Sequence, residues 1–358
     1  MIAYIIKKIT YSILVLWGAL TLVFFIFNIL TGDPARMMLD KREDSEQLAI
    51  IKHKYAFDRS VGEQYALYWN DVLPLSIHHN SATSFTSLAS GKYQFIELVT
   101  LTNYTLALKV PYLRESFVRT GTSVTTIIGN TFKNTFVLAL SSIVIALFLG
   151  LILGVFSALY KDTLIDKTIL LISVLGMSLP SFFASIIIAW IFGFVLHNFT
   201  GLNMIGSLYA VDDYGRGSFL QLKNLILPAI TLGIRPLSVI IQLCRNSLLE
   251  VLSMDYVRTA TAKGLSKFTV IFKHALRNAL NPVVTAVSGW FASLLAGAVF
   301  VEYIFAWNGI GKEIVDALNR MDLPVVMGSV LFIASIFVII NIIVDLIYGW
   351  LDPRIRIS

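Results

Sequence analysis

The sequence contains very little charge and almost no cysteine. Cys244 is the one cysteine among 358 residues, which excludes a disulfide within the chain. Charged residues make up 14% of the sequence and hydrophobic residues 56%, and the mean hydropathy is +0.76. A water-soluble domain rarely combines so little charge with so much apolar surface. These shortages argue against an ordinary soluble fold and for a chain whose main solvent is a lipid bilayer.

Long uncharged runs recur along the chain. A helix needs roughly 20 apolar residues to cross a hydrocarbon core about 30 Å thick. Runs of this kind cover residues 9–32, 134–160, 168–196, 278–301 and 323–344. Residues 222–243 carry Lys223 at their start and Arg235 further on as their charges, and make a sixth candidate. We therefore predict an all-α, multi-pass integral membrane protein with six transmembrane helices.

Basic residues lie next to the ends of these runs. Lys7 and Lys8 precede the first run, and further Lys and Arg residues occur in segments 161–167, 245–277 and 354–356. Lys and Arg concentrate in the cytoplasmic loops of membrane proteins. With six spans that start inside, these segments and both termini fall on the cytoplasmic side. This placement accounts for the net charge of +6 without nucleic acid as a partner.

The predicted spans divide the chain into four parts. They are a cytoplasmic N-terminus with the first transmembrane helix at 1–32, an external loop or cap at 33–120, a transmembrane domain at 121–350 and a cytoplasmic tail at 351–358. The transmembrane domain contains a cytoplasmic loop at 245–282. In the external part, residues 41–70 have a helical pattern, whereas residues 76–90 are rich in Ser, Thr and His and are expected to form a loop.

The cytoplasmic loop has the pattern of a short helix followed by an amphipathic one. Ser253 is a candidate N-cap, residues 256–263 suit a short helix, and Gly264 suits its end because glycine tolerates a positive φ. Apolar residues then recur at helical spacing from Phe268 until Pro282. Two interpretations fit these features: a docking helix for a partner protein, and an interfacial helix that lies on anionic lipid.

A sequence resemblance favours the docking helix. The segment DYVRTATAKGLS at 255–266, followed by HALRNAL at 274–280, resembles the cytoplasmic EAA-type loop of ABC importer permeases of the dipeptide and oligopeptide subgroup. Three further segments are similar to the same subgroup: GDP at 32–34, VEYIF with WNGIG between 301 and 311, and DLIY with LDPR between 345 and 354. The loop departs from the family pattern in two places. Arg258-Thr259-Ala260 replaces the EAA triplet, and Thr261 stands where relatives have arginine.

The resemblance implies the architecture of a type I ABC importer permease in the cell inner membrane. Such a chain forms half of a pathway for dipeptides or oligopeptides, together with a second, related permease subunit and surrounded by membrane lipid. Two ABC ATPase subunits and an extracytoplasmic solute-binding protein are the other implied partners. Because ATP hydrolysis belongs to those partners, the chain itself is expected to be no enzyme and to need no cofactor. The family's coupling helix contacts the ATPase, which here implicates Asp255, Tyr256, Arg258, Ala260, Lys263 and Gly264.

Two charged residues are candidates for the translocation pathway. Arg235 follows Lys223 by twelve residues, which corresponds to about 18 Å along a helix at roughly 1.5 Å per residue. A charge so deep in the bilayer either faces a pathway or forms a structural ion pair with a carboxylate, and the sequence leaves both open. Glu302 ends the fifth predicted span on the outside. It either borders an external gate or is a solvated charge at a helix end.

Other function classes compete with the importer permease. A permease for nickel or another small solute would carry the same loop motif. A secondary transporter driven by an ion gradient should show inverted repeats or paired titratable groups within its spans, and the sequence displays neither. A membrane enzyme would need a catalytic cluster that the sequence lacks. The five histidines form no HExxH or similar pattern, so we predict no metal-binding residues.

Overall fold

The computed structural model describes residues 2–30, 49, 52–53, 55–82, 84–211 and 217–351. They belong to two compact units. The first comprises Met1–Lys8, Thr131–Glu313 and Ser335–Ser358, and the second comprises Ile9–Asn130 and Ile314–Ala334. The segments 32–34, 41–48 and 352–358, on which some predictions fall, lie outside the described residues.

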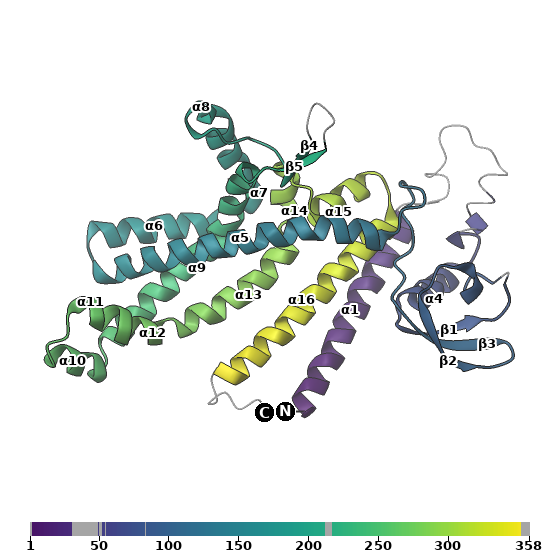
Figure 1. Cartoon of the computed structure of the whole chain (residues 1–358), viewed down its shortest axis with the longest axis horizontal. Helices are drawn as coiled ribbons and strands as arrows, with labels where there is room; N and C mark the ends of the chain where they lie inside the picture. The colour runs from purple at the N-terminus through teal and green to yellow at the C-terminus, as the bar shows by residue number, and fades with distance from the viewer. Residues whose placement is uncertain are drawn as a thin grey trace. The chain divides into compact units, whose positions relative to one another are not determined.

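Long helices make up most of the described chain (Figure 1). They are α1 (Ile2–Leu30), α5 (Val124–Leu159), α9 (Lys223–Leu252), α13 (Asn281–Gly297) and α16 (Leu323–Leu351). By length and apolar composition, α5, α9 and α16 can each cross a bilayer, and the apolar part of α1 is shorter. Helices suit this environment because they satisfy every backbone hydrogen bond internally. The predicted helices at these runs are confirmed.

The run at 168–196, predicted as one span, is broken at Pro180. The helical segments on either side, α6 (Leu164–Ser178) and α7 (Ser181–Ile188) with its π-helical continuation Ala189–Val195, meet at 112°. Leu179 is extended, with φ −73° and ψ 127°, because a proline disfavours helical geometry at the preceding residue. The predicted span is therefore bent at Pro180. The chain continues through α8 (His197–Thr200) and the hairpin β4 (Tyr209–Val211) and β5 (Ser218–Leu220).

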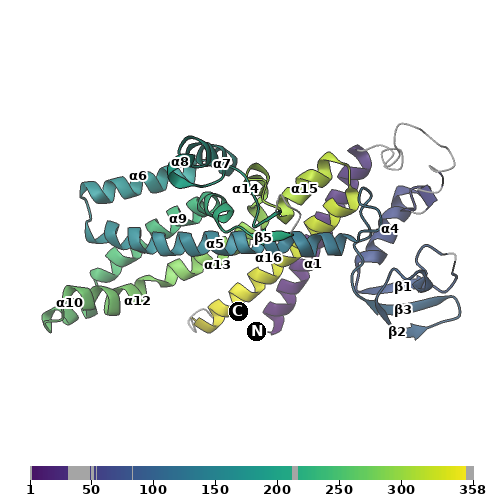
Figure 2. The same ribbon diagram turned by 45° about the horizontal axis from the view of Figure 1, so that its top comes forward.

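Glycines allow α5 and α6 to pack directly on α9, and the three helices lie side by side in two views (Figures 1 and 2). A Cβ added at Gly150 would lie 2.6 Å from Cγ2 of Ile240, and one at Gly154 would lie 2.7 Å from Cβ of Cys244. A Cβ at Gly176 would lie 2.6 Å from the Ser238 hydroxyl. The three glycines therefore permit a close helix approach, which leaves α9 little freedom to slide along its neighbours.

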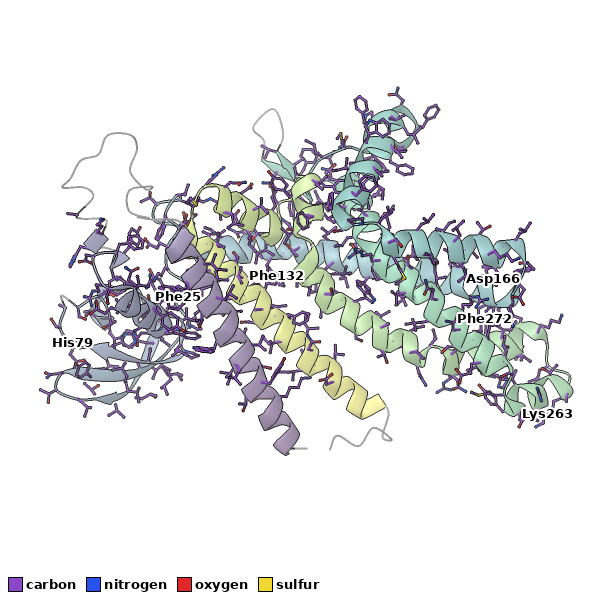
Figure 3. All side chains as sticks on the ribbon, turned by 180° about the vertical axis from the view of Figure 1, so that it is seen from behind. Phe25, His79, Phe132, Asp166, Lys263 and Phe272 are labelled. Atoms are coloured by element: carbon purple, nitrogen blue, oxygen red, sulfur yellow. The ribbon has the colours of Figure 1, made fainter. Side chains whose placement is uncertain are left out.

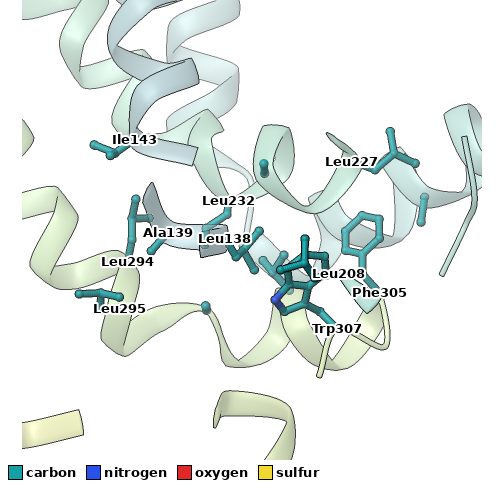
Figure 4. Close-up of a cluster of buried hydrophobic side chains, with 14 residues drawn as sticks. Leu138, Ala139, Ile143, Leu208, Leu227, Leu232, Leu294, Leu295, Phe305 and Trp307 are labelled. Atoms are coloured by element: carbon teal, nitrogen blue, oxygen red, sulfur yellow. The ribbon is translucent and has the colours of Figure 1, made fainter. Parts of the chain in front are cut away.

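Two buried apolar clusters hold the first unit together. The first joins α5, α9 and α13 to the loop after α14 (Val299–Ile304), as Figure 4 shows. Its labelled members are Leu138, Ala139, Ile143, Leu208, Leu227, Leu232, Leu294, Leu295, Phe305 and Trp307. The second cluster joins the end of α9 to the loop at 253–280 and the start of α13. A continuous apolar interior therefore runs along α9.

The second unit contains a small domain of helix and sheet. Ser60 caps α4 (Val61–Val72) in a capping box with Glu63, which satisfies the first amides of the helix. Strands β1 (Leu75–His79), β2 (Phe95–Thr100) and β3 (Tyr104–Lys109) form an antiparallel sheet in the order β1-β3-β2, and a 3₁₀ turn lies at Leu88–Ser90. The sheet corrects two predictions. The chain is not all-α, and residues 76–90 begin with a strand.

Polar side chains fill the interior of this small domain. The buried Asp71 carboxylate accepts hydrogen bonds from the Tyr93 hydroxyl at 2.7 Å and from Nε of Arg114 at 2.8 Å. Lys109 donates to the backbone carbonyl of Asp71. In β1, Ser76 and His78 are buried, while apolar neighbours of theirs such as Ile77 face outward.

Candidate functional site

The short helix α10 (Asp255–Ala262) follows α9 directly. Met254 precedes it as the N-cap, whereas the Ser253 hydroxyl donates to the Glu250 carbonyl at 2.7 Å and belongs to the end of α9. The prediction of Ser253 as the N-cap is therefore wrong. Gly264 has φ +77° and its amide donates to the Thr261 carbonyl at 3.0 Å. Its predicted role as the terminator is confirmed, because this left-handed conformation favours glycine.

One face of α10 is buried and the other is exposed. Val257 and Ala260 pack into the second apolar cluster, with Leu248 and Val251 of α9 among their neighbours. The other five predicted coupling residues, Asp255, Tyr256, Arg258, Lys263 and Gly264, are exposed. Ala260 therefore anchors the helix, and the exposed residues offer a surface to a partner. The Arg258 to Asp255 ion pair at 3.8 Å is solvent-exposed and contributes little to stability.

A second helical segment packs against α10. It consists of α11 (Lys267–Thr269), the π-helical Val270–Ala275 and α12 (Leu276–Ala279), and it leads into α13. The Tyr256 hydroxyl accepts a hydrogen bond from Nδ2 of Asn278 at 2.7 Å and donates to the His274 carbonyl at 3.4 Å. These contacts and the buried Val257 fix the orientation of α10.

Two aromatic side chains extend the exposed surface beyond Gly264. Phe268 and Phe272 are 70% and 46% exposed, and their ring centroids are 4.5 Å apart. Lys263 and Phe272 are labelled near each other on this loop in Figure 3. Helical spacing places both phenylalanines on the apolar side of the amphipathic segment, and in the structure this side is exposed at these two positions. Paired exposed aromatics of this kind are typical of a contact site for another protein.

A buried ion pair joins α6 to α9 ten residues before α10 begins. Nε and Nη2 of Arg245 each lie 2.7 Å from an oxygen of the Asp166 carboxylate, which is almost inaccessible to solvent. Ser157 and the Asp162 amide donate to the same carboxylate, so all its oxygen positions are used. Sequence analysis missed this pair, since Asp166 and Arg245 are distant in sequence and each looks like an ordinary loop charge.

Arg235 lies beside a cavity of about 110 Å³. The cavity is bounded by α6, α7, α9 and α13 and opens where α6 breaks into α7. Its lining consists of Gly176, Leu179, Ser181, Ala184, Thr231, Leu232, Ile234, Arg235, Trp290, Ser293 and Leu294. Nη2 of Arg235 is 3.5 Å from the Leu179 carbonyl. Within the described part of the chain, Arg235 forms no ion pair.

Glu302, the other pathway candidate, does not line this cavity. Its side chain is completely buried in α14 and accepts hydrogen bonds from the Thr135 hydroxyl at 2.6 Å and from the amides of Gly311 at 2.7 Å and Lys312 at 3.1 Å. A Cβ at Gly309 would collide with the carboxylate, so the turn before α15 (Ile310–Asn319) needs glycine there. The alternative of a solvated helix-end charge is wrong. Glu302 organises the WNGIG turn from inside.

These features define a class of protein: a helical, membrane-embedded transport component with a cavity between its helices and a short helix, exposed on one face, between two of them. The chain belongs to the family of binding-protein-dependent transport system inner membrane components. The family profile matches residues 150–357, and the profile of the family's N-terminal region matches residues 1–89. Members of this family are transport components and not enzymes.

Relatives extend over the whole chain. It is 33% identical to the di/tripeptide transport system permease protein DppB of Pseudomonas aeruginosa, with 99% of each chain covered. It is 32% identical to the dipeptide permease DppB of Escherichia coli K12, again over 99% of each chain, and 39% identical to that of Bacillus subtilis over 66% of this chain and 71% of the relative. Among solved structures, the inward-facing MetNI methionine ABC transporter matches with a TM-score of 0.48 and 18% identity, covering 62% of this chain and 95% of that chain.

Proposed function

We propose that this chain is a transmembrane permease subunit of an ATP-driven importer for dipeptides or oligopeptides. Its similarity over full length to permeases named for dipeptide and di/tripeptide transport carries this proposal. The chain forms half of a translocation pathway with a second, related permease subunit. Two ABC ATPase subunits and an extracytoplasmic solute-binding protein complete the assembly in the inner membrane.

The exposed face of α10 is the proposed contact with an ATPase subunit. Asp255, Tyr256, Arg258, Lys263 and Gly264 form this face, and Phe268 and Phe272 extend it. Its buried face is fixed to the end of α9, and α9 is held to α6 by the Arg245 to Asp166 pair. A displacement of α10 by nucleotide-driven closure would therefore move α9, with Arg235, together with α6.

The proposed topology has six membrane crossings and cytoplasmic termini. An ion pair between Lys8 of α1 and Asp345 of α16 supports the placement of both chain ends on one side, because the two residues flank the first and last apolar segments. Residues around 33–120 then form an external cap, and the loop at 245–282 lies in the cytoplasm. The bent α6–α7 pair counts as one crossing in this arrangement.

Purification of the tagged chain from its native host in mild detergent tests the assembly. We expect two ATPase subunits and a sister permease to co-purify, and the reconstituted complex to take up dialanine only with ATP and binding protein. A chain recovered alone, under conditions that preserve known ABC transporters, would contradict the proposal and direct attention to ion-gradient-driven transport. ATP-dependent uptake of nickel but not of dialanine would retain the permease and replace the cargo.

A further inference from the structure

The geometry points to the Arg235 cavity as the binding site for the C-terminal carboxylate of the transported peptide. This inference rests on the proposed function, because it assigns an orientation to the cargo in the same pathway. The peptide enters the cavity with its carboxylate against Arg235, and its ammonium group stays away from the guanidinium.

Two arginines on α9 differ in how their charge is compensated. The Arg245 guanidinium is bonded through Nε and Nη2 to the buried Asp166 carboxylate. Arg235, by contrast, makes one long contact, 3.5 Å from Nη2 to the Leu179 carbonyl, and has no carboxylate partner among the described residues. A guanidinium carries five N–H donors, and a cation at membrane depth is costly unless an anion or several acceptors compensate it. Arg235 is therefore arranged to receive an anion from outside the chain.

The shape and lining of the cavity suit the end of a peptide. A single water needs roughly 10–15 Å³ of such space, so a cavity of about 110 Å³ accepts a carboxylate and part of the last residue. Leu179, Trp290 and Leu294 supply apolar walls, and Ser181 and Ser293 also line the cavity. A guanidinium binds a carboxylate through two parallel hydrogen bonds, which a terminal amide cannot reproduce.

The broken helix places this site at a point that can change during transport. The cavity lies where α6 and α7 meet at 112°, and its walls come from four helices, including α9. Because α9 leads directly into α10, a movement of the docking helix would displace the guanidinium relative to α7 and α13. A carboxylate held by Arg235 in one state would then be released in the other.

Uptake of dialanine and of dialanine amide tests the inference. Each rate is measured in proteoliposomes that contain the whole transporter and saturating binding protein. Arg235→Gln should slow dialanine uptake about tenfold, the factor expected for loss of a charge-assisted bond, and should change amide uptake little. Arg235→Lys should retain part of the preference for the free acid. Lys223→Gln removes a cation from the same helix outside the cavity and should leave the acid-to-amide ratio unchanged.

Ser181→Asp gives an independent test that does not depend on the folding of an Arg235 variant. An aspartate at the first position of α7 is favourable for the helix and places a carboxylate in the cavity. It should compete with the peptide and lower dialanine uptake, while amide uptake persists. An unchanged acid-to-amide ratio in Arg235→Gln and in Ser181→Asp would overturn the inference. Arg235 would then bind a lipid phosphate or a group of the sister permease. Absence of ATP-dependent dialanine uptake by the wild-type complex would instead overturn the proposed function.

Discussion

Gly264 holds a backbone conformation that other residues adopt only with strain. Its φ is +77°, and no atom lies within 4 Å of the position that a Cβ would take, so the cost of a substitution is conformational and not steric. A left-handed conformation costs an ordinary residue about 1–2 kcal/mol, and more for a β-branched one. That energy would distort the end of α10, where the exposed Lys263 and Leu265 flank the glycine.

We expect Gly264→Val to uncouple ATP hydrolysis from transport. Strain of about 1–2 kcal/mol changes the equilibrium constant for the native helix end by about 5- to 30-fold, so the peptide transported per ATP should fall by up to a similar factor. Gly264→Asn is the matched control, because asparagine tolerates positive φ. Both variants are compared by ATPase and uptake rates in the same proteoliposomes. A valine variant with the wild-type ratio would count against α10 as a lever.

At the scale of elements, the Asp166 to Arg245 pair fixes α6 to α9. Both side chains are largely buried, and removal of one partner from such a pair typically costs about 3–5 kcal/mol because the other charge is left buried alone. Asp166→Ala should therefore lower the melting temperature of the purified complex by several degrees and weaken coupling. Asp162→Asn is the control, since this neighbour is 80% exposed and its φ of +63° suits asparagine. Equal melting of both variants would mean that the pair does not hold the helices together.

The stability of the domain that contains β1, β2 and β3 should depend on pH through His78. Burial is the main cause that lowers the His78 pKa from its usual 6.5, and Lys109 lowers it further. Below about pH 6.5 the unfolded chain therefore binds a proton at His78 that the folded domain does not bind. The contribution of neutral His78 to the stability of the folded domain is complete above this pH and is lost as the pH falls. Resistance of the external domain to protease in right-side-out vesicles should decline from pH 7.5 to 5.5.

His78→Gln should remove this part of the decline. The neighbouring His79→Gln, on the opposite side of the strand, should retain it, and comparison at each pH cancels the pH dependence of the protease. His78 also bonds through its ring nitrogens to the Ser76 hydroxyl at 2.8 Å and the Thr86 carbonyl at 2.7 Å, so it has no nitrogen left for a metal. An identical decline in the His78 variant and the wild type would refute the assignment.

The same strand explains what sequence reasoning could and could not predict. The apolar helices, the short helix α10 and the Gly264 terminator follow from apolar run length and glycine conformation. The sheet did not follow, because β1 is inverted: Ser76 and His78 point to the polar interior around Asp71, while Leu75 and Ile77 are 52% and 60% exposed. A segment rich in Ser, Thr and His, with few apolar residues for a core, is expected to form a loop and not a strand. Contacts between distant segments, such as Asp166 with Arg245, leave no local pattern at all.

At the scale of the whole molecule, the number of crossings depends on the α6–α7 pair. Its 112° bend is compatible with a broken span and with a re-entrant loop that returns to the same side. Residue 96, in β2, and residue 263, at the end of α10, are separated by α5, this pair and α9. They lie on opposite sides of the membrane if the pair crosses and on the same side if it returns.

Cysteine labelling distinguishes these arrangements because Cys244, the only native cysteine, is fully buried. Ile96 is 66% exposed and Lys263 is also exposed, so Ile96→Cys and Lys263→Cys should both react with a membrane-impermeant maleimide when their side is accessible. We expect Ile96→Cys to react in spheroplasts and Lys263→Cys only in inverted vesicles, with the unmodified chain as the background control. Labelling of both from one side would mean that the α6–α7 pair does not cross the membrane. The proposed docking helix α10 would then lie away from any cytoplasmic ATPase. The docking role of α10 therefore requires that the chain cross the membrane at the Pro180 break.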